Sequence, residues 1–97
     1  MLDKVTKETF EPRKGETFTL SDEAAGEVEL TLAEVLGTGL QGRASREQFA
    51  LHFRGPRDPR LPQRIYRLEN AELGAIEIFL VPIARDERGM IYEAVFT

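Results

Sequence analysis

Hydrophobic residues recur at every second position along most of this chain, and this alternation constrains the fold more than any other feature of the sequence. In EVELTLAEVL (residues 27–36), the apolar residues at positions 28, 30 and 32 would share one face, opposite Glu29 and Thr31. EQFALHF (residues 47–53) repeats the pattern. Successive side chains of a β-strand point to opposite faces, so this alternation is typical of strands with one buried and one solvated face. The sequence therefore predicts an all-β fold.

Two departures from strict alternation add detail. Glu34 falls on the apolar face of its segment, which indicates a β-bulge or the end of regular strand pairing at this point. AIEIFLVPI (residues 75–83) is apolar at odd and even positions alike. Such a composition is typical of a central strand, or of a strand that is covered on both faces.

Six strands are expected, joined by connections that are rich in turn-forming residues. Gly74 and Gly89 each end such a connection and are placed for a positive φ angle. Connections of these lengths suit hairpins, which need no crossover helix. We therefore expect one domain over residues 1–97, an antiparallel meander that closes into a small barrel or a compact sandwich. The expected strands are residues 16–20, 27–36, 47–53, 64–69, 75–83 and 90–96.

One short helical turn is expected near the N-terminus, which makes the fold all-β with a minor α element. Thr6 is placed to cap a turn through KETF (residues 7–10), and the turn should end before Pro12. Its apolar residues, Phe10 among them, would then cover one end of the sheet.

Composition limits the functions that the chain can perform. With 97 residues, of which 41% are hydrophobic and 31% charged, the chain suits a single folded core. It has no cysteine, which excludes a disulfide framework and a thiolate metal site. No apolar run approaches the roughly 20 residues that a membrane-spanning helix needs, and MLDKVTKETF lacks the apolar stretch of a secretory signal. We expect a cytoplasmic protein that does not contact a membrane.

Charge is segregated along the chain, although the net charge is only −4. Residues 1–36 carry nine acids and four bases, residues 37–68 two acids and seven bases, and residues 69–97 six acids and two bases. In one interpretation, acidic and basic strands lie side by side and their exposed rows pair. In the other, the middle segment forms a basic patch that attracts an acidic partner or a second subunit. The negative net charge argues against a nucleic-acid partner.

Residues suited to catalysis are sparse. The chain has one histidine, His52, and two serines, Ser21 and Ser45, and nothing in the pattern brings them together as a hydrolytic site. Glu93 is expected to be partly buried, where pairing with an arginine is a simpler explanation than a role as general acid. GTGLQG (residues 37–42) has the spacing of a nucleotide-binding loop but precedes a strand instead of a helix. We expect no enzyme activity, no cofactor and no metal, and an enzyme that uses His52 or Glu93 is the least favoured alternative.

The stretch FRGPRDPRLPQRIYRLEN (residues 53–70) holds the densest group of arginines. Its prolines, spaced by three, match a ligand pattern for SH3 domains. Aromatic platforms for nucleic-acid bases are missing, because Phe53 is expected to point inward. The simplest interpretation is a rigid connection between two strands, in which Arg54 and Arg67 could also pair with acids of neighbouring strands. The candidate binding residues on its surface are Arg54, Arg57, Arg60 and Arg64.

The second half of the chain resembles a family of small bacterial proteins that is classed as a domain of unknown function. The resemblance rests on FALHFRGP (residues 49–56), LPQRIYRL (61–68), LGAIEIFLVP (73–82) and YEAVF (92–96), with a similar F-x-P-x-x-G-x-x-F-x-L pattern at residues 10–20. Members commonly carry a histidine where this chain has Asn70, so that position offers no shared catalytic residue. The resemblance implies a stand-alone domain with no assigned reaction, encoded in the gene neighbourhoods of phage-tail-like collar proteins.

Two functions follow as expectations. The first is a non-enzymatic protein-interaction or assembly module, an accessory of a phage-tail-like or surface structure, which binds a protein partner or associates with itself. The alternative is a small barrel that binds an anionic small molecule or an acidic partner through the loop from Arg54 to Arg64.

Overall fold

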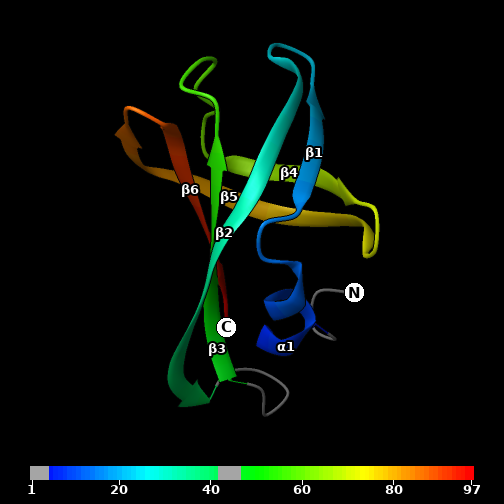
Figure 1. Cartoon of the computed structure of the whole chain (residues 1–97), viewed down its shortest axis with the longest axis vertical. Helices are drawn as coiled ribbons and strands as arrows, with labels where there is room; N and C mark the ends of the chain where they lie inside the picture. The colour runs from blue at the N-terminus through cyan, green and yellow to red at the C-terminus, as the bar shows by residue number, and fades with distance from the viewer. Residues whose placement is uncertain (1–4, 42–46) are drawn as a thin grey trace.

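The computed structural model describes residues 5–41 and 47–97. Helix α1 (Lys7–Phe10) continues into a 3₁₀ turn, η2 (Glu11–Arg13). Six strands follow, as expected from the sequence: β1 (Thr17–Asp22), β2 (Gly26–Gln41), β3 (Glu47–Gly55), β4 (Arg64–Asn70), β5 (Gly74–Asp86) and β6 (Gly89–Phe96) (Figure 1). Ser45 and the end of the glycine segment 37–42 lie outside the described residues. Within the described residues, no helix has the length and hydrophobicity needed to cross a membrane.

The six strands form one closed ring in the order β1-β2-β3-β6-β5-β4, and every neighbouring pair is antiparallel. The order departs from a simple meander at one point, because β3 lies beside β6 and β4 lies beside β5 and β1. The chain thus makes two three-stranded meanders joined by residues 56–63. This connection is longer than the about two to five residues of a hairpin loop, so it can pass over the β5–β6 hairpin and reach β4.

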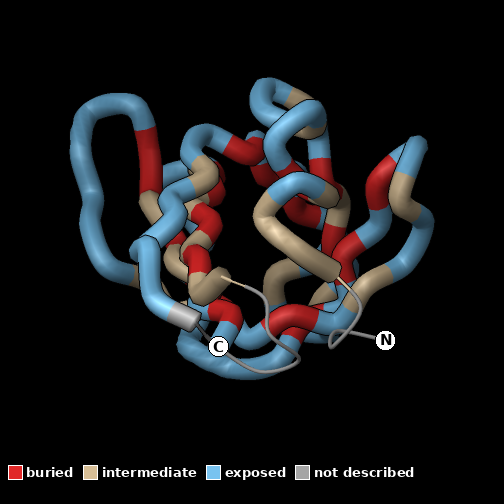
Figure 2. Tube along the Cα trace, turned by 90° about the horizontal axis from the view of Figure 1, so that it is seen from below, coloured by how far each residue is buried: buried red, intermediate tan, exposed pale blue. Residues whose placement is uncertain are grey.

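Alternate residues of each strand point into the barrel and form its core. Strand β4 shows the pattern clearly, since Tyr66 and Leu68 are buried while Ile65 and Arg67 are exposed. Buried and exposed segments alternate in this way along the chain (Figure 2). Gly74 and Gly89 have positive φ angles, as expected. The buried hydrophobic residues are Phe10, Phe18, Leu20, Val28, Leu30, Leu32, Phe49, Leu51, Phe53, Leu61, Tyr66, Leu68, Ile78, Leu80, Met90, Tyr92, Ala94 and Phe96.

Helix α1 covers one end of the barrel through a cluster of three aromatic rings. The ring of Phe10 lies 5.9 Å from that of Phe49 and 5.7 Å from that of Phe96, measured between centroids. The rings of Phe49 and Phe96 are stacked 4.6 Å apart. Aromatic pairs of this kind contribute about 0.5–1.5 kcal/mol beyond the burial of their area. The N-terminal turn is therefore part of the core, although it is only one turn long.

The structure confirms the expected bulge and decides between the two alternatives for residues 75–83, because β5 is a central strand that lies between β4 and β6 in the ring. The pairing of β2 with β3 shifts between Leu32 and Glu34, which places a bulge at the expected position. The expectation that β5 is covered on both faces is wrong, since Phe79 is 49% and Ile83 is 46% exposed. A barrel has a single interior, so the apolar residues on the outer face of β5 remain in contact with solvent.

Candidate binding site at the arginine loop

The arginine loop, defined as residues 54–64, is fixed to the barrel by its own apolar and backbone groups. Leu61 is buried, and its backbone N–H donates a hydrogen bond to the hydroxyl oxygen of Tyr92 at 2.9 Å. The hydroxyl of Tyr66 donates to the carbonyl oxygen of Pro62 at 2.5 Å. These contacts hold the loop against β6 and β4, so the arginines project from a rigid support.

The loop also lies directly against the turn between β5 and β6. Gly89 has a φ of +138°, and a Cβ atom at this position would lie 2.0 Å from the carbonyl oxygen of Gly55. Only a glycine fits so close to another backbone while adopting this conformation. The close approach brings the β5–β6 hairpin and the arginine loop together as one surface.

Of the four candidate arginines, two are engaged in contacts within the barrel. The Nη1 atom of Arg54 lies 2.9 Å from Oδ1 of Asp86, in the β5–β6 hairpin. This hydrogen bond, together with one from the backbone N–H of Arg88, holds the pKa of Asp86 below its ordinary value. The guanidinium of Arg64 lies 5.6 Å from the ring centroid of Tyr66 and 3.5 Å from Asp22. Arg54 thus pairs with an acid, as expected, but the acid belongs to β5, which is separated from β3 by β6. The expectation that Arg67 pairs with a neighbouring strand is wrong, because its partner Glu69 lies on the same strand, β4.

The other two, Arg57 and Arg60, are exposed and have no ion pair within the part of the chain that the structure describes. Arg60 borders a groove of about 220 Å³, and Arg85 of β5 borders the same groove. Sequence reasoning missed Arg85, because it counted this residue within the acidic third of the chain. The remaining lining residues are mainly apolar: Pro82, Ile83, Ala84 and Met90.

The chemistry of this groove is that of a site for a carboxylate next to an apolar group. Two guanidinium groups can each offer a planar set of N–H donors to an anion. Ile83, which is 46% exposed, supplies apolar surface beside them. We call the surface formed by Arg60, Arg85 and Ile83 the basic groove.

The residues considered for catalysis lie elsewhere. Nε2 of His52 and Oε2 of Glu93 are 3.0 Å apart on the outer face of adjacent strands. The expectation that Glu93 pairs with an arginine is therefore wrong, because the β3–β6 register places the histidine directly opposite. Ser21 pairs with Glu27 in the β1–β2 ladder, away from His52. In the described parts of the chain no group of three or more His, Cys, Asp or Glu residues could hold a metal ion.

The glycine segment that has the spacing of a nucleotide-binding loop is part of a strand in its described residues. Gly37 and Gly39 belong to β2. The backbone N–H of Gly39 donates to Oε2 of Glu47 at 2.7 Å, and this bond is the main cause that lowers the pKa of Glu47. The N–H of Gly39, which a bound phosphate would need as a donor, is therefore already hydrogen-bonded to a carboxylate of the protein itself.

A comparison with family models identifies the family of the chain. The family model of the domain of unknown function DUF6916 matches residues 5–96. The chain belongs to the DUF6916 family. No curated protein and no solved structure gives a significant match to it. The family membership confirms the coarse resemblance seen in the sequence, and it assigns no reaction, ligand or partner.

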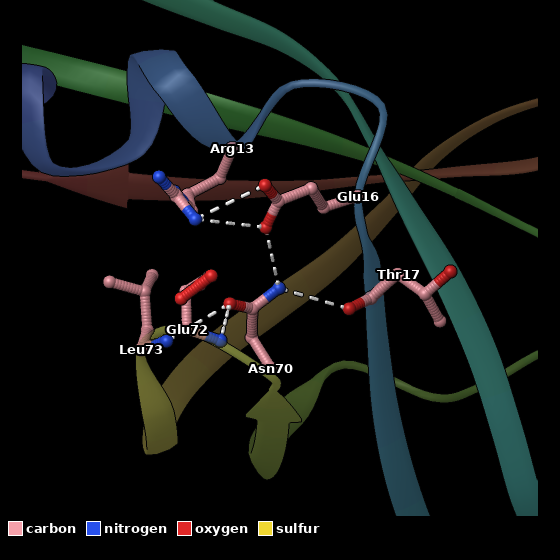
Figure 3. Close-up of polar contacts among 6 residues, drawn as sticks. All are labelled: Arg13, Glu16, Thr17, Asn70, Glu72 and Leu73. Carbon is pink, nitrogen blue, oxygen red and sulfur yellow. Dashed lines mark hydrogen bonds and ion pairs between the residues drawn. The ribbon is translucent and has the colours of Figure 1, made fainter.

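Within this DUF6916 domain, Asn70 is the one buried polar residue among those described, and Figure 3 shows its polar contacts. Its Oδ1 atom accepts hydrogen bonds from the backbone N–H groups of Glu72 and Leu73, at 2.9 and 3.0 Å. Its Nδ2 atom donates to Oε1 of Glu16 at 3.2 Å and to the carbonyl oxygen of Thr17 at 3.1 Å. The amide of Asn70 thus makes four hydrogen bonds within the protein, which join the β4–β5 turn to the start of β1.

Proposed function

We propose that this domain is a non-enzymatic protein-interaction or assembly module that binds an acidic segment of a partner protein in the basic groove. The observation that carries the proposal is that Arg60 and Arg85, from separate segments of the chain, border one groove and have no acidic partner among the described residues. Arginines on a rigid surface beside exposed apolar residues are typical of interfaces. The assembly that the sequence resemblance suggests is a phage-tail-like or surface structure, and a cytoplasmic location stays a prediction.

Two further observations support binding over catalysis. His52 and Glu93 contact each other on the outer face of the sheet, and neither lines the basic groove. Arg54 and Arg64 are held by Asp86 and Asp22, so they support the loop instead of presenting free charge. The proposal therefore assigns binding to fewer of the four arginines expected from the sequence, and it adds Arg85.

The alternative function is binding of an anionic small molecule in the same groove. A volume of about 220 Å³ is below the roughly 300–1,000 Å³ of most small-molecule pockets. It suits one or two side chains of a docked protein segment better than a whole metabolite. We therefore favour a partner protein over a small ligand.

The test uses a fluorescein-labelled peptide in which glutamate alternates with leucine, followed by fluorescence anisotropy at low ionic strength. We expect binding that weakens as salt is added and that is lost in the double variant Arg60→Glu with Arg85→Glu. The matched control is Arg88→Glu, which changes an exposed arginine of the same hairpin outside the groove and should leave binding unchanged. Circular dichroism checks that each variant is folded.

The alternatives give different results in the same set of proteins. A rise in melting temperature with phosphate or citrate, lost in the double variant, with no binding of the peptide, would support the small-anion function instead. Equal binding of the peptide to the wild type and the double variant would contradict any role for the basic groove. A protein that binds no acidic peptide and stays monomeric in light scattering would contradict the proposal as a whole.

A further inference from the structure

Strand β5 is paired on both sides along only part of its length. Residues Gly74–Leu80 pair with β4, from Asn70 opposite Gly74 to Arg64 opposite Leu80. Pairing with β6 begins only at Val81, opposite Glu93. In Figure 1, β5 and β6 diverge beyond this point, and β6 continues along β3. Among the residues that the structure describes, residues 75–80 of β5 therefore have a neighbouring strand on one side only.

The unpaired side of this segment carries backbone groups that are ready to form hydrogen bonds. In an antiparallel pair, alternate residues send both their N–H and C=O groups away from the partner strand. No other backbone hydrogen bond reaches residues 75–80 within the described part of the chain. Natural proteins usually cover or shorten such edges, because an open edge is a template for another strand.

An apolar groove runs along this open edge. It has a volume of about 510 Å³ and lies between β5 and the N-terminal turn. The groove is lined on the sheet side by Ala75, Ile76 and Glu77 of β5, together with Arg67 of β4 and Leu73 of the β4–β5 turn, and on the side of α1 by Val5 and Thr9 (Figure 1). The groove is large enough for several side chains of an extended segment, and it is separate from the basic groove at the other end of β5.

We propose that this groove is a strand-addition site for a partner protein. An extended segment of the partner pairs with residues 75–80 of β5 through backbone hydrogen bonds and places alternate apolar side chains in the groove. This is the mode by which exposed sheet edges bind peptides, with the backbone giving affinity and the side-chain pockets giving specificity. The partner segment also carries a basic residue that lies beside Glu77.

The charge of the residues that line the groove favours a different protein, rather than a second copy of this chain, as the partner. Glu77 is exposed in the middle of the open edge and has no ion pair among the described residues. Its cross-strand neighbour Arg67 also lines the groove but contacts Glu69 at 3.6 Å, so Glu77 is the charged residue of the lining that lacks an ion pair among the described residues. Two copies that paired edge to edge about Glu77 would bring like charges together, which is unfavourable. A lysine or arginine of a partner would complement Glu77.

The test uses two acetylated and amidated peptides, TVKVTV and TVEVTV, titrated into the isotopically labelled protein and followed by NMR. TVKVTV should shift the amide resonances of residues 75–80 and slow the exchange of alternate amides there. The same peptide with alternate backbone nitrogens methylated cannot pair as a strand and should not bind. In Glu77→Lys, the affinity for TVKVTV should fall about two- to fivefold, and TVEVTV should become the better ligand. Glu87→Lys, in the turn at the far end of β5, is the matched control and should bind as the wild type does.

Four outcomes would overturn the proposal. The first is an absence of shifts at residues 75–80 with any peptide, and the second is equal binding of the methylated peptide. The third is a set of shifts at the edge that depends on protein concentration without peptide, which would assign the edge to a second copy. Binding of TVKVTV only after deletion of residues 1–4 would assign the groove to the chain's own N-terminal segment and would equally contradict a partner protein.

Discussion

The hydroxyl oxygen of Tyr92 accepts a hydrogen bond from the backbone N–H of Leu61 at 2.9 Å, and both residues are only 1% exposed. A buried N–H that loses its acceptor costs about 1–3 kcal/mol. This contact therefore joins the arginine loop to β6 at a place that water does not reach. The position of Arg60, one residue before Leu61, depends on a tyrosine in the core.

Tyr92→Phe should lower the free energy of unfolding by about 1–3 kcal/mol and expose the Leu61 amide to exchange. Urea denaturation measures the first effect, and native-state hydrogen exchange measures the second. Tyr66→Phe is the control, because its hydroxyl donates to Pro62 and its loss should leave the Leu61 amide protected. If the Leu61 amide exchanges at the wild-type rate in Tyr92→Phe, the hydrogen bond is not what holds the loop.

A methyl group at Gly89 should separate the β5–β6 hairpin from the arginine loop. Its Cβ would lie 2.0 Å from the backbone oxygen of Gly55, an atom that cannot move aside as a side chain can. Gly26→Ala provides the control, since Gly26 also has a positive φ but a Cβ atom added there would have no neighbouring atom within 4 Å. We expect Gly26→Ala to cost about 1–2 kcal/mol and Gly89→Ala to cost about 1–3 kcal/mol more. Equal losses in urea denaturation would show that the two segments are not held together tightly.

Asn70→Asp should destabilise the protein by roughly 2–3 kcal/mol at neutral pH. The new carboxylate can still accept from Glu72 and Leu73, but it cannot donate to Thr17 and it faces Glu16 at about the present 3.2 Å. The double variant Asn70→Asp with Glu16→Gln restores a donor opposite the new acceptor and should recover part of the loss. Thermal and urea denaturation measure both variants, and a double variant that is no better than the single one would contradict this account.

The fold was largely predictable because its main determinant is local. Alternation places Tyr66 and Leu68 inward whatever the strand order, and a phase change at Glu34 is visible without any partner strand. The strand order was not predictable, since nothing in the sequence of residues 56–63 indicates whether they form a hairpin loop or pass over another hairpin. The outer face of β5 was misjudged for a related reason. A continuous apolar run looks the same whether it is buried on both faces or, as at Phe79, half in solvent.

The candidate site was predictable only in part, because charge along a sequence does not show which charges meet. Arg54 and Arg64 seemed equivalent to Arg60, yet the folded barrel brings Asp86 to Arg54 and Asp22 to Arg64. Arg85 joins the groove because the β5–β6 hairpin folds back beneath the arginine loop. Such relationships between distant residues become visible only once the register is known.

Asp86→Asn should reduce stability at neutral pH but not at low pH. Arg54 and the N–H of Arg88 hold the pKa of Asp86 below its ordinary value of 3.8 in the folded protein. The stabilisation is therefore complete above the ordinary value and is lost as the pH falls through the lower, folded value. Asparagine keeps the oxygen that accepts from Arg88 and Gly89, so only the charge is removed.

Urea denaturation at a series of pH values should show the free energies of unfolding of the wild type and Asp86→Asn converging below about pH 4. Asp58→Asn, an exposed acid of the arginine loop with no ion pair among the described residues, should track the wild type throughout. A difference between the wild type and Asp86→Asn that persists unchanged at low pH would show that the charge of Asp86 is not what stabilises the hairpin.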